Sequence, residues 1–358
     1  MKRILLLSIP AGSGHTRAAE ALEAYAQTHL DASVVHADVS AYTSKTLTFV
    51  HMGMYLFLRK HARALWGFLY YVSNNKKIAN RLNRTHTLQK HSARDLIAYI
   101  KKQNPDIIIC TYFGIGQMIS SYVQSHNIPM YIVLTDYHTH ALSCMQQVSG
   151  YFVATEEMKH ELMQYGAQEK HVHVTGIPVH PAFQNQDIET GRSADFEIPT
   201  ENKIILLIAN MYTDREIRII LKSLSRIKNV TVFLAGTEKN YQTPDVVFHL
   251  IPLGWSNDIH RYIKLSDLVI TKSGGLIVSE CIALKTPMII PLPFPGQEYE
   301  NAKYIEAHDL GSICRDIKKI DTMAMPYLFS NYKFPSFNPQ TSDPNAKIFD
   351  VLLDTKTL

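Results

Sequence analysis

Two adjacent glycines after a short apolar run form the stretch of this chain best suited to binding a charged ligand. The run Leu268 to Ile270 leads into Thr271-Lys272-Ser273-Gly274-Gly275, and a helix is expected to begin at about Gly275. Glycine lets a ligand touch the backbone, and the free N–H groups at the positive end of a helix favour an anion such as a diphosphate. Glu280 lies further along this helix, where its carboxylate is placed to accept hydrogen bonds from the paired hydroxyls of a sugar.

A second polar loop follows the next apolar strand, Met288 to Ile290. It reads Pro295-Gly296-Gln297-Glu298 and continues to Asn301. The amide of Gln297 and the carboxylate of Glu298 are suited to hydroxyl groups. Together the two stretches predict a sugar-nucleotide site, with backbone for phosphate, one carboxylate for ribose, and an amide and a carboxylate for the donor sugar. The alternative is a glycine-capped turn with solvated polar residues, which the presence of Glu280 and this loop disfavours.

A third glycine loop opens the first helix and carries a histidine. The first strand ends in Pro10-Ala11-Gly12-Ser13-Gly14-His15, which lacks the third glycine of the dinucleotide fingerprint. Asp38 ends the next strand, where a ribose-binding acid would lie, so NAD binding is an alternative. A helix N-terminus disfavours a charged imidazole, and His15 is therefore expected to be neutral and able to accept a proton. A histidine that only caps the turn is the other interpretation.

A carboxylate and two histidines follow the fourth strand, in the run Thr135-Asp136-Tyr137-His138-Thr139-His140. Such groups at the carboxyl end of a strand are well placed for acid–base chemistry. They are also permissible zinc ligands, but no third histidine or cysteine ligand lies nearby in the sequence. Asp136 as a plain helix cap is a further alternative.

Positive charge is concentrated in one part of the first half. Between Lys45 and Lys102 there are twelve lysines and arginines and one acid, Asp95, and aromatic residues are interleaved with them. An interfacial helix offers this combination to anionic lipid headgroups. The predicted membrane contacts are Arg59, Lys60, Arg63 and Trp66. A core helix with solvated charges is the main alternative, and the patch is too apolar to favour nucleic acid.

The elements that must position these groups alternate between strands and helices. In the first half the expected strands are Ile4 to Ile9, Ser33 to Asp38, Asp106 to Cys110, Met130 to Leu134, Tyr151 to Ala154 and His171 to Val174. The expected helices are His15 to His29, Ser92 to Gln103 and Met158 to Tyr165, the last capped by Thr155. Continuous apolar strands are typical of a parallel sheet that is buried on both faces.

A second alternation follows a polar stretch rich in turn residues. Its expected strands are Ile204 to Ile208, Val230 to Leu234 and Val246 to Leu250, besides the two strands named above. Its expected helices are Asp214 to Ile227, Asn257 to Leu265 capped by Ser256, and a final helix at about Asn345 to Leu353. The region Ile320 to Ser342 gives no clear assignment. The sequence thus predicts an α/β protein of two Rossmann-like doubly wound domains facing across a cleft, at 1–180 and 201–342, with a linker at 181–200 and a helix and tail at 343–358.

Composition sets further bounds. The chain has 358 residues, a hydrophobic fraction of 46% and a net charge of +4, which suit a globular protein with a sizeable core. Its four cysteines are far apart and are expected to be buried thiols in a reducing compartment. No stretch approaches the roughly 18 to 20 apolar residues of a membrane span. A cytoplasmic protein, or one attached to a membrane surface, is therefore expected.

Five motifs in order along residues 2–311 resemble one family. They are Gly12-Ser13-Gly14-His15, Leu134-Thr135-Asp136-Tyr137, Val174-Thr175-Gly176-Ile177-Pro178, Thr271-Lys272-Ser273-Gly274-Gly275 and Pro295-Gly296-Gln297-Glu298. The chain is similar to the monogalactosyldiacylglycerol synthases and processive diacylglycerol glucosyltransferases. These belong to the GT-B glycosyltransferases, together with the UDP-N-acetylglucosamine transferase of peptidoglycan synthesis.

The resemblance implies an inverting, metal-independent hexosyl transfer from a UDP-sugar to a lipid hydroxyl, with no cofactor and no nucleic-acid partner. The N-terminal domain would receive a diacylglycerol acceptor at the inner face of the cell membrane, and the C-terminal domain would hold the donor. Carried over by position, the uracil meets the backbone of Gly254 and Trp255, the diphosphate Gly274 and Gly275, the ribose Glu280, and the donor sugar Gln297 and Glu298. The base is His15, with Asp136 second. Gly12, Gly14 and His140 lie on the acceptor side, and Ser273 and Asn301 belong to the donor motifs.

Three positions depart from the family pattern. The glycine-rich turn after the first donor-domain strand is replaced by Ala209-Asn210-Met211-Tyr212-Thr213-Asp214, which removes close backbone approach to phosphate. Ser273 replaces a proline common in the lipid branch, and Ser143 stands where many members have tryptophan. A non-catalytic nucleotide-sugar sensor, an NAD-dependent dehydrogenase and a UDP-sugar epimerase of the same fold are therefore kept as alternatives.

Overall fold

The computed structural model of the chain describes residues 2–10, 13–43, 62–84, 93–145, 147–184, 196–239, 241, 248–336 and 343–353. The chain divides into two compact units. The first comprises Met1–Pro181, Phe294–Gln297 and Pro339–Leu358, and the second comprises Ala182–Pro293 and Glu298–Asn338. Each unit is built around its own parallel sheet, as the continuous apolar strands predicted.

The first unit contains a six-stranded sheet in the order β2-β1-β3-β4-β5-β6. Its strands are β1 (Arg3–Ser8), β2 (Ser33–Asp38), β3 (Ile107–Cys110), β4 (Met130–Val133), β5 (Gly150–Val153) and β6 (Val172–Val174). Every pairing in this sheet is parallel. The strand order reverses at β1, so the carboxyl ends of β1 and β3 form the switch point at which ligands of doubly wound folds bind.

Helices connect the strands of the first unit. They are α1 (Ser13–His29), α3 (Arg63–Ser73), α4 (Lys76–Arg84), α6 (Arg94–Gln103), α7 (Phe113–Ser125), α8 (Glu156–Tyr165) and α14 (Pro344–Leu353). The Thr155 hydroxyl caps α8 by accepting from the Met158 N–H, as predicted. Residues 44–61 and 85–92 of the basic stretch lie outside the described residues.

The second unit contains another fully parallel six-stranded sheet, in the order β12-β11-β10-β7-β8-β9. Its strands are β7 (Lys203–Ile208), β8 (Val230–Ala235), β9 (His249–Gly254), β10 (Leu268–Ile270), β11 (Met288–Pro291) and β12 (Gly311–Cys314). Its helices are α9 (Asp214–Leu224), α10 (Ile259–Leu265), α11 (Gly275–Ala283), α12 (Gln297–Ala307) and α13 (Ile320–Phe329). Helix α11 begins at the predicted glycine.

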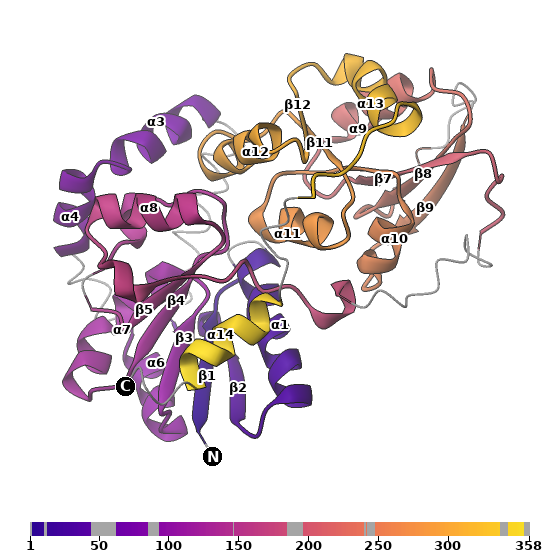
Figure 1. Cartoon of the computed structure of the whole chain (residues 1–358). Helices are drawn as coiled ribbons and strands as arrows, with labels where there is room; N and C mark the ends of the chain where they lie inside the picture. The colour runs from indigo at the N-terminus through magenta and orange to yellow at the C-terminus, as the bar shows by residue number, and fades with distance from the viewer. Residues whose placement is uncertain are drawn as a thin grey trace. The chain divides into compact units, whose positions relative to one another are not determined.

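The final helix, α14, returns to the first unit and packs beside α1 (Figure 1). Ile348, Phe349 and Leu352 are buried in one cluster with Ile4 and Leu6 of β1 and apolar residues of α1. The Phe349 ring also stacks on Tyr25 of α1, with 5.8 Å between the ring centroids. The last described helix of the chain therefore completes the core of the N-terminal unit.

Several predicted boundaries are wrong, each for a local reason. Helix α10 begins at Ile259, so Ser256 does not cap it, and its hydroxyl instead accepts from the Asp258 N–H at 3.0 Å. Strand β9 runs from His249 to Gly254 beside β8, four residues past its predicted end at Leu250, and residues 246 and 247 of the predicted strand lie outside the described residues. Helix α9 ends at Leu224, and Ile320–Phe329, which had no assignment, is helical despite Pro326.

Candidate active site

His15 lies in the first turn of α1, where it reaches the ends of two other strands. Its Nδ1 is 2.8 Å from the carbonyl oxygen of Thr111, after β3, and 3.0 Å from the Thr135 hydroxyl oxygen, after β4. A carbonyl can only accept, so Nδ1 carries the proton and Nε2 is the unprotonated nitrogen. The histidine is therefore oriented by its neighbours as a neutral proton acceptor.

The charge environment of His15 agrees with this assignment. Burial lowers the pKa of His15 from its ordinary 6.5, while the Asp136 carboxylate and the hydrogen bond to Thr111 raise it. Burial is the larger effect, so the neutral form is favoured at neutral pH. Parallel strands bring Asp136 into electrostatic reach of His15, because their carboxyl ends meet at one edge of the sheet. Gly14 belongs to the same turn of α1, and Gly12 lies outside the described residues.

His140 uses both ring nitrogens within the protein. Its Nδ1 accepts from the Leu142 N–H at 3.1 Å, so Nε2 carries the proton and donates to the Tyr70 carbonyl oxygen at 3.1 Å. The Ser73 hydroxyl is 3.2 Å from the same Nε2. Burial lowers the pKa of His140, which agrees with a neutral ring. His140 thus ties the last turn of α3 to the segment that follows β4.

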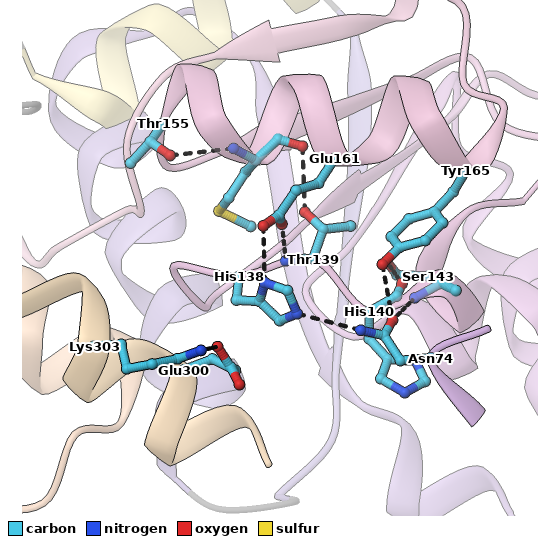
Figure 2. A network of polar contacts seen from close by, with 12 residues as sticks. Asn74, His138, Thr139, His140, Ser143, Thr155, Glu161, Tyr165, Glu300 and Lys303 are labelled. Carbon is cyan, nitrogen blue, oxygen red and sulfur yellow. Dashed lines mark hydrogen bonds and ion pairs between the residues drawn. The ribbon is translucent and has the colours of Figure 1, made fainter. Parts of the chain in front are cut away.

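A neighbouring histidine, His138, is held by Glu161 of α8 (Figure 2). The Glu161 carboxylate accepts from His138 Nδ1 at 2.9 Å and from the Thr139 N–H at 2.6 Å. His138 Nε2 faces the side-chain amide of Asn74 at 3.4 Å. In the described part of the chain, no group of three or more histidine, cysteine, aspartate or glutamate side chains could hold a metal ion.

Helices α3 and α4 expose an apolar surface. Leu65, Phe68, Leu69 and Val72 share one face of α3, and Phe68 is 64% exposed. Arg63 is exposed and its guanidinium carbon lies 5.3 Å from the centroid of the Phe294 ring, while Trp66 is half-buried. Arg59 and Lys60 lie outside the described residues. Among the described residues, no helix has the length and apolar character needed to cross a membrane.

The predicted phosphate turn opens helix α11. Gly274 is the N-cap of α11 and, being glycine, has no side chain with which to cap the first N–H groups of this helix. The Ser273 hydroxyl donates to the carbonyl oxygen of Glu298 at 2.5 Å, and the Asn301 amide donates to the Ser273 carbonyl oxygen at 2.9 Å. These two bonds fix the turn against the first turns of α12. Ser273 and Asn301 therefore hold the turn in shape.

The two carboxylates predicted to meet sugars are both buried. Glu280, in the middle of α11, is 1% exposed, and Glu298, at the start of α12, is 9% exposed. Gln297 is exposed. The strands that precede α11 and α12 are adjacent in the sheet, since β10 pairs with β11. Both helices therefore begin at the same edge of the sheet, where a nucleotide-sugar would lie.

The residues predicted to meet uracil are joined to an acid that the sequence did not single out. The Trp255 N–H donates to the Glu238 carboxylate at 3.1 Å. Gly254 adopts a φ of +61°, a left-handed conformation that favours glycine, and a side chain there would meet Glu238 at 2.9 Å. The Trp255 side chain is 68% exposed. A base that used the Trp255 N–H would have to replace Glu238.

The turn without glycines after β7 places a tyrosine at the carboxyl-terminal edge of the second sheet. The Tyr212 N–H donates to the Ala209 carbonyl oxygen at 3.0 Å, and the Tyr212 ring packs against the core. Its hydroxyl oxygen is buried and has no hydrogen-bond partner among the described residues. Burial, and then the charge of Glu298, raise the pKa of Tyr212 well above 10. A protonated phenol therefore lies in electrostatic reach of Glu298.

Asp38 is engaged in its own turn. It ends β2 as predicted, but its carboxylate accepts from the Ser40 N–H at 2.8 Å and caps the short 3-10 helix that follows. This contact gives the carboxylate a local role that needs no ribose.

Two family models match different parts of the chain. Residues 15–179 match the family model of monogalactosyldiacylglycerol (MGDG) synthase, and residues 222–324 match that of the glycosyltransferase family 28 C-terminal domain. Among solved structures, MurG of Acinetobacter baumannii matches with a TM-score of 0.64 and 13% identity, covering 99% of this chain and 100% of that one. A UDP complex of MnaA from S. aureus matches with a TM-score of 0.58 and 14% identity, covering 98% and 96%.

The two parallel sheets and these structural neighbours show that the chain has the GT-B fold, and the family-model matches show that it is a glycosyltransferase. Within that class, its resemblance to the MGDG synthases and processive diacylglycerol glucosyltransferases is confirmed. The processive diacylglycerol beta-glucosyltransferase of Bacillus cytotoxicus is 25% identical, over 98% of this chain and 93% of that protein. A protein of the same name from Bacillus cereus is 27% identical, over 89% and 83%.

Proposed function

We propose that this glycosyltransferase moves a hexose from a UDP-sugar to the free hydroxyl of diacylglycerol, with inversion and without a metal ion. The second unit binds the donor and the first unit binds the acceptor. Relatives that match nearly the whole chain are named for transfer of glucose to diacylglycerol, and this supports both substrates. The observation that supports this chemistry best is the hydrogen bond from His15 Nδ1 to the Thr111 carbonyl oxygen, because it leaves Nε2 unprotonated.

In the proposed reaction, His15 Nε2 takes the proton of the acceptor hydroxyl as its oxygen attacks the anomeric carbon. The bond to the UDP oxygen breaks on the opposite face, so a single displacement inverts the configuration. The free N–H groups at the start of α11 stabilise the charge that develops on the diphosphate, which is the role a metal ion has in other transferases. Asp136 supports the imidazolium that forms, because its charge raises the pKa of His15.

The exposed apolar face of α3 supports contact with a membrane surface. Its side chains Leu65, Phe68, Leu69 and Val72 are flanked on α4 by exposed Ile78 and Leu82 and by exposed cations. The exposed cations of α4 are Lys76, Lys77 and Arg81. Apolar side chains beside lysine and arginine bind anionic bilayers by insertion and by charge. We place the enzyme peripherally on the inner face of the cell membrane.

The deciding experiment measures UDP release from a panel of UDP-sugars, with and without diacylglycerol in anionic vesicles. We expect release that depends on one UDP-hexose and on the lipid, and a His15→Gln variant that binds UDP normally but turns over at least about 100-fold more slowly. UDP binding without release on any acceptor would instead support a nucleotide-sugar sensor. Conversion of a UDP-sugar without lipid would support an epimerase, and binding of NAD but not UDP a dehydrogenase.

Two further measurements test the manner of transfer. The anomeric proton coupling of the glycolipid product should show the β configuration when the donor is an α-linked UDP-hexose. Turnover should persist after removal of divalent cations by EDTA. Retention of configuration, or loss of activity that only added Mg²⁺ or Mn²⁺ restores, would contradict these parts of the proposal.

The membrane contact has a matched control within the chain. Replacing Leu65, Phe68 and Leu69 with serine should abolish sedimentation with anionic vesicles. Replacing Met325 and Phe329, which are similarly exposed on α13, should leave sedimentation unchanged. Equal sedimentation of the two variants would show that α3 is not the membrane-binding face.

A further inference from the structure

The last turn of α3 is bound to the segment after β4 through one asparagine side chain. Asn74 Oδ1 accepts from the Ala141 N–H at 2.7 Å and from the Tyr165 hydroxyl at 3.1 Å. Its Nδ2 faces His138 Nε2 at 3.4 Å. The side chain of Asn74, the residue that ends α3, therefore contacts the segment after β4 twice and α8 once (Figure 2).

Other hydrogen bonds join the same pieces. Glu161 of α8 holds both His138 Nδ1 and the Thr139 N–H, and His140 donates to the Tyr70 carbonyl oxygen of α3. We call these residues, Asn74, His138, Thr139, His140 and Glu161, the Asn74 network. Each polar atom in it has a defined role, so the network fixes the end of α3 and the segment 138–141 as one body.

The two ends of this body carry different parts of the proposed function. On one side, the exposed apolar face of α3 is the proposed membrane contact. On the other, the segment 138–141 is preceded by Thr135, whose hydroxyl lies 3.0 Å from His15 Nδ1, and by Asp136, whose charge acts on His15. Asp136 is only two residues before His138 in the chain, so a shift of the Asn74 network should also move Asp136 relative to His15.

We infer that Asn74, His138 and Glu161 are positioning residues that couple α3 at the lipid surface to the placement of Asp136 and Thr135 around His15. In this arrangement, Thr135 and Asp136 keep their places around His15 as long as the end of α3 stays bound to the segment 138–141. A bilayer that covers the apolar face of α3 would hold it there. The inference rests on the proposed transfer to a membrane lipid. It assigns roles to three residues for which the reaction chemistry alone has no use.

The test compares Asn74→Ala, Asn74→Asp and a control, Asn80→Ala, which changes an exposed residue of α4. Asn74→Ala should lower kcat on diacylglycerol vesicles about tenfold or more, with KM for the UDP-sugar unchanged. It should also move the acidic limb of the kcat/KM profile, because the charge of Asp136 no longer acts on His15 from the same place. Asn74→Asp keeps the oxygen that accepts from Ala141 and Tyr165 but loses the amide that faces His138, so it should recover only part of kcat.

A second variant separates positioning from folding. Glu161→Gln keeps one accepting oxygen, and in a double-mutant cycle its effect on kcat should not add to that of Asn74→Ala, since both act through His138. Folded Asn74→Ala protein with the kcat and pH profile of wild type would overturn the inference. So would a loss of kcat with an unmoved acidic limb and full additivity with Glu161→Gln. Absence of turnover in wild type would instead refute the proposed function itself.

Discussion

At the scale of single residues, the pKa of His15 determines how activity should depend on pH. The base works when Nε2 is unprotonated, and burial lowers the pKa of His15 below 6.5. We therefore expect kcat/KM to be level through neutral pH and to fall only below pH 6.5. In Asp136→Asn the limb should move to still lower pH, because the carboxylate that raises this pKa has been removed.

A pH–rate profile of both proteins measures this shift, and the position of the limb matters more than the height of the plateau. An acidic limb at the same pH in wild type and Asp136→Asn would show that the two groups do not interact. Complete loss of activity in Asp136→Asn, with His15→Gln still active, would make Asp136 the base.

Gly274 offers a test of the phosphate turn that leaves folding intact. Its φ of −67° suits any residue, and a Cβ there would have only Lys272 atoms and Ile277 in ordinary contact, the nearest at 3.5 Å. Gly274→Ala should therefore keep its thermal midpoint and lose about tenfold or more in UDP affinity, equivalent to about 1.4 kcal/mol. Calorimetric titration with UDP measures the loss. Unchanged affinity would show that no ligand approaches the backbone at this glycine.

The hydroxyl group of Tyr212 should not contribute to the stability of the fold. Its buried hydroxyl lacks a partner among the described residues, and an unpaired buried hydroxyl costs about 1–3 kcal/mol. Tyr212→Phe should therefore unfold at an equal or higher urea concentration than wild type. A clear loss of stability in the urea titration would mean that the hydroxyl has a partner in the folded protein. Thr213→Ala, which removes the neighbouring capping box, is the destabilising comparison.

At the scale of elements, helix α14 completes the core of the first unit, although β1 and α1 of that core lie at the other end of the sequence. Phe349 is 1% exposed and packs with β1 and α1. Phe349→Ala should lower the free energy of unfolding of the first unit by about 3–5 kcal/mol, as for other buried phenylalanines. Phe329→Ala, at an exposed position of α13, should change stability by no more than about 0.5 kcal/mol. Equal chemical denaturation midpoints for the two variants would place α14 outside the core.

At the scale of the whole molecule, acid should affect the two units unequally. The pKa values of His15, His140 and His173, all in the first unit, are lowered, chiefly by burial. The unfolded chain therefore binds more protons than the native first unit as the pH falls through 6.5, and stability is lost in that range. The carboxyl groups with lowered pKa, such as Asp106 and Asp214, contribute stability that is lost only at more acidic pH.

Scanning calorimetry at pH 7.5 and pH 5.5 tests this prediction. The transition of the first unit should move to lower temperature on acidification more than that of the second unit, and His173→Gln should reduce the shift. A larger shift of the second unit would contradict the assignment of the three buried histidines as its cause.

The sequence by itself determined the architecture, and it supplied the residues that are proposed to carry the chemistry. Continuous apolar strands such as Ile107–Cys110 can be buried on both faces only in a parallel sheet, and glycine at 274 and 275 marks a strand-to-helix turn. These signals are local, because they depend on periodicity and on backbone conformation. The family resemblance followed from the same short motifs, and the comparisons confirmed it.

Only the tertiary structure decided which residues meet. Asn74 and Glu161 are 87 positions apart and share no motif, yet both hold His138. Glu238 at the Trp255 N–H, the Thr111 carbonyl at His15 and α14 on the N-terminal core are likewise contacts between distant segments. Strand order and register set such contacts, and both arise from packing over the whole sheet, so a pattern read along a few neighbouring residues does not contain them.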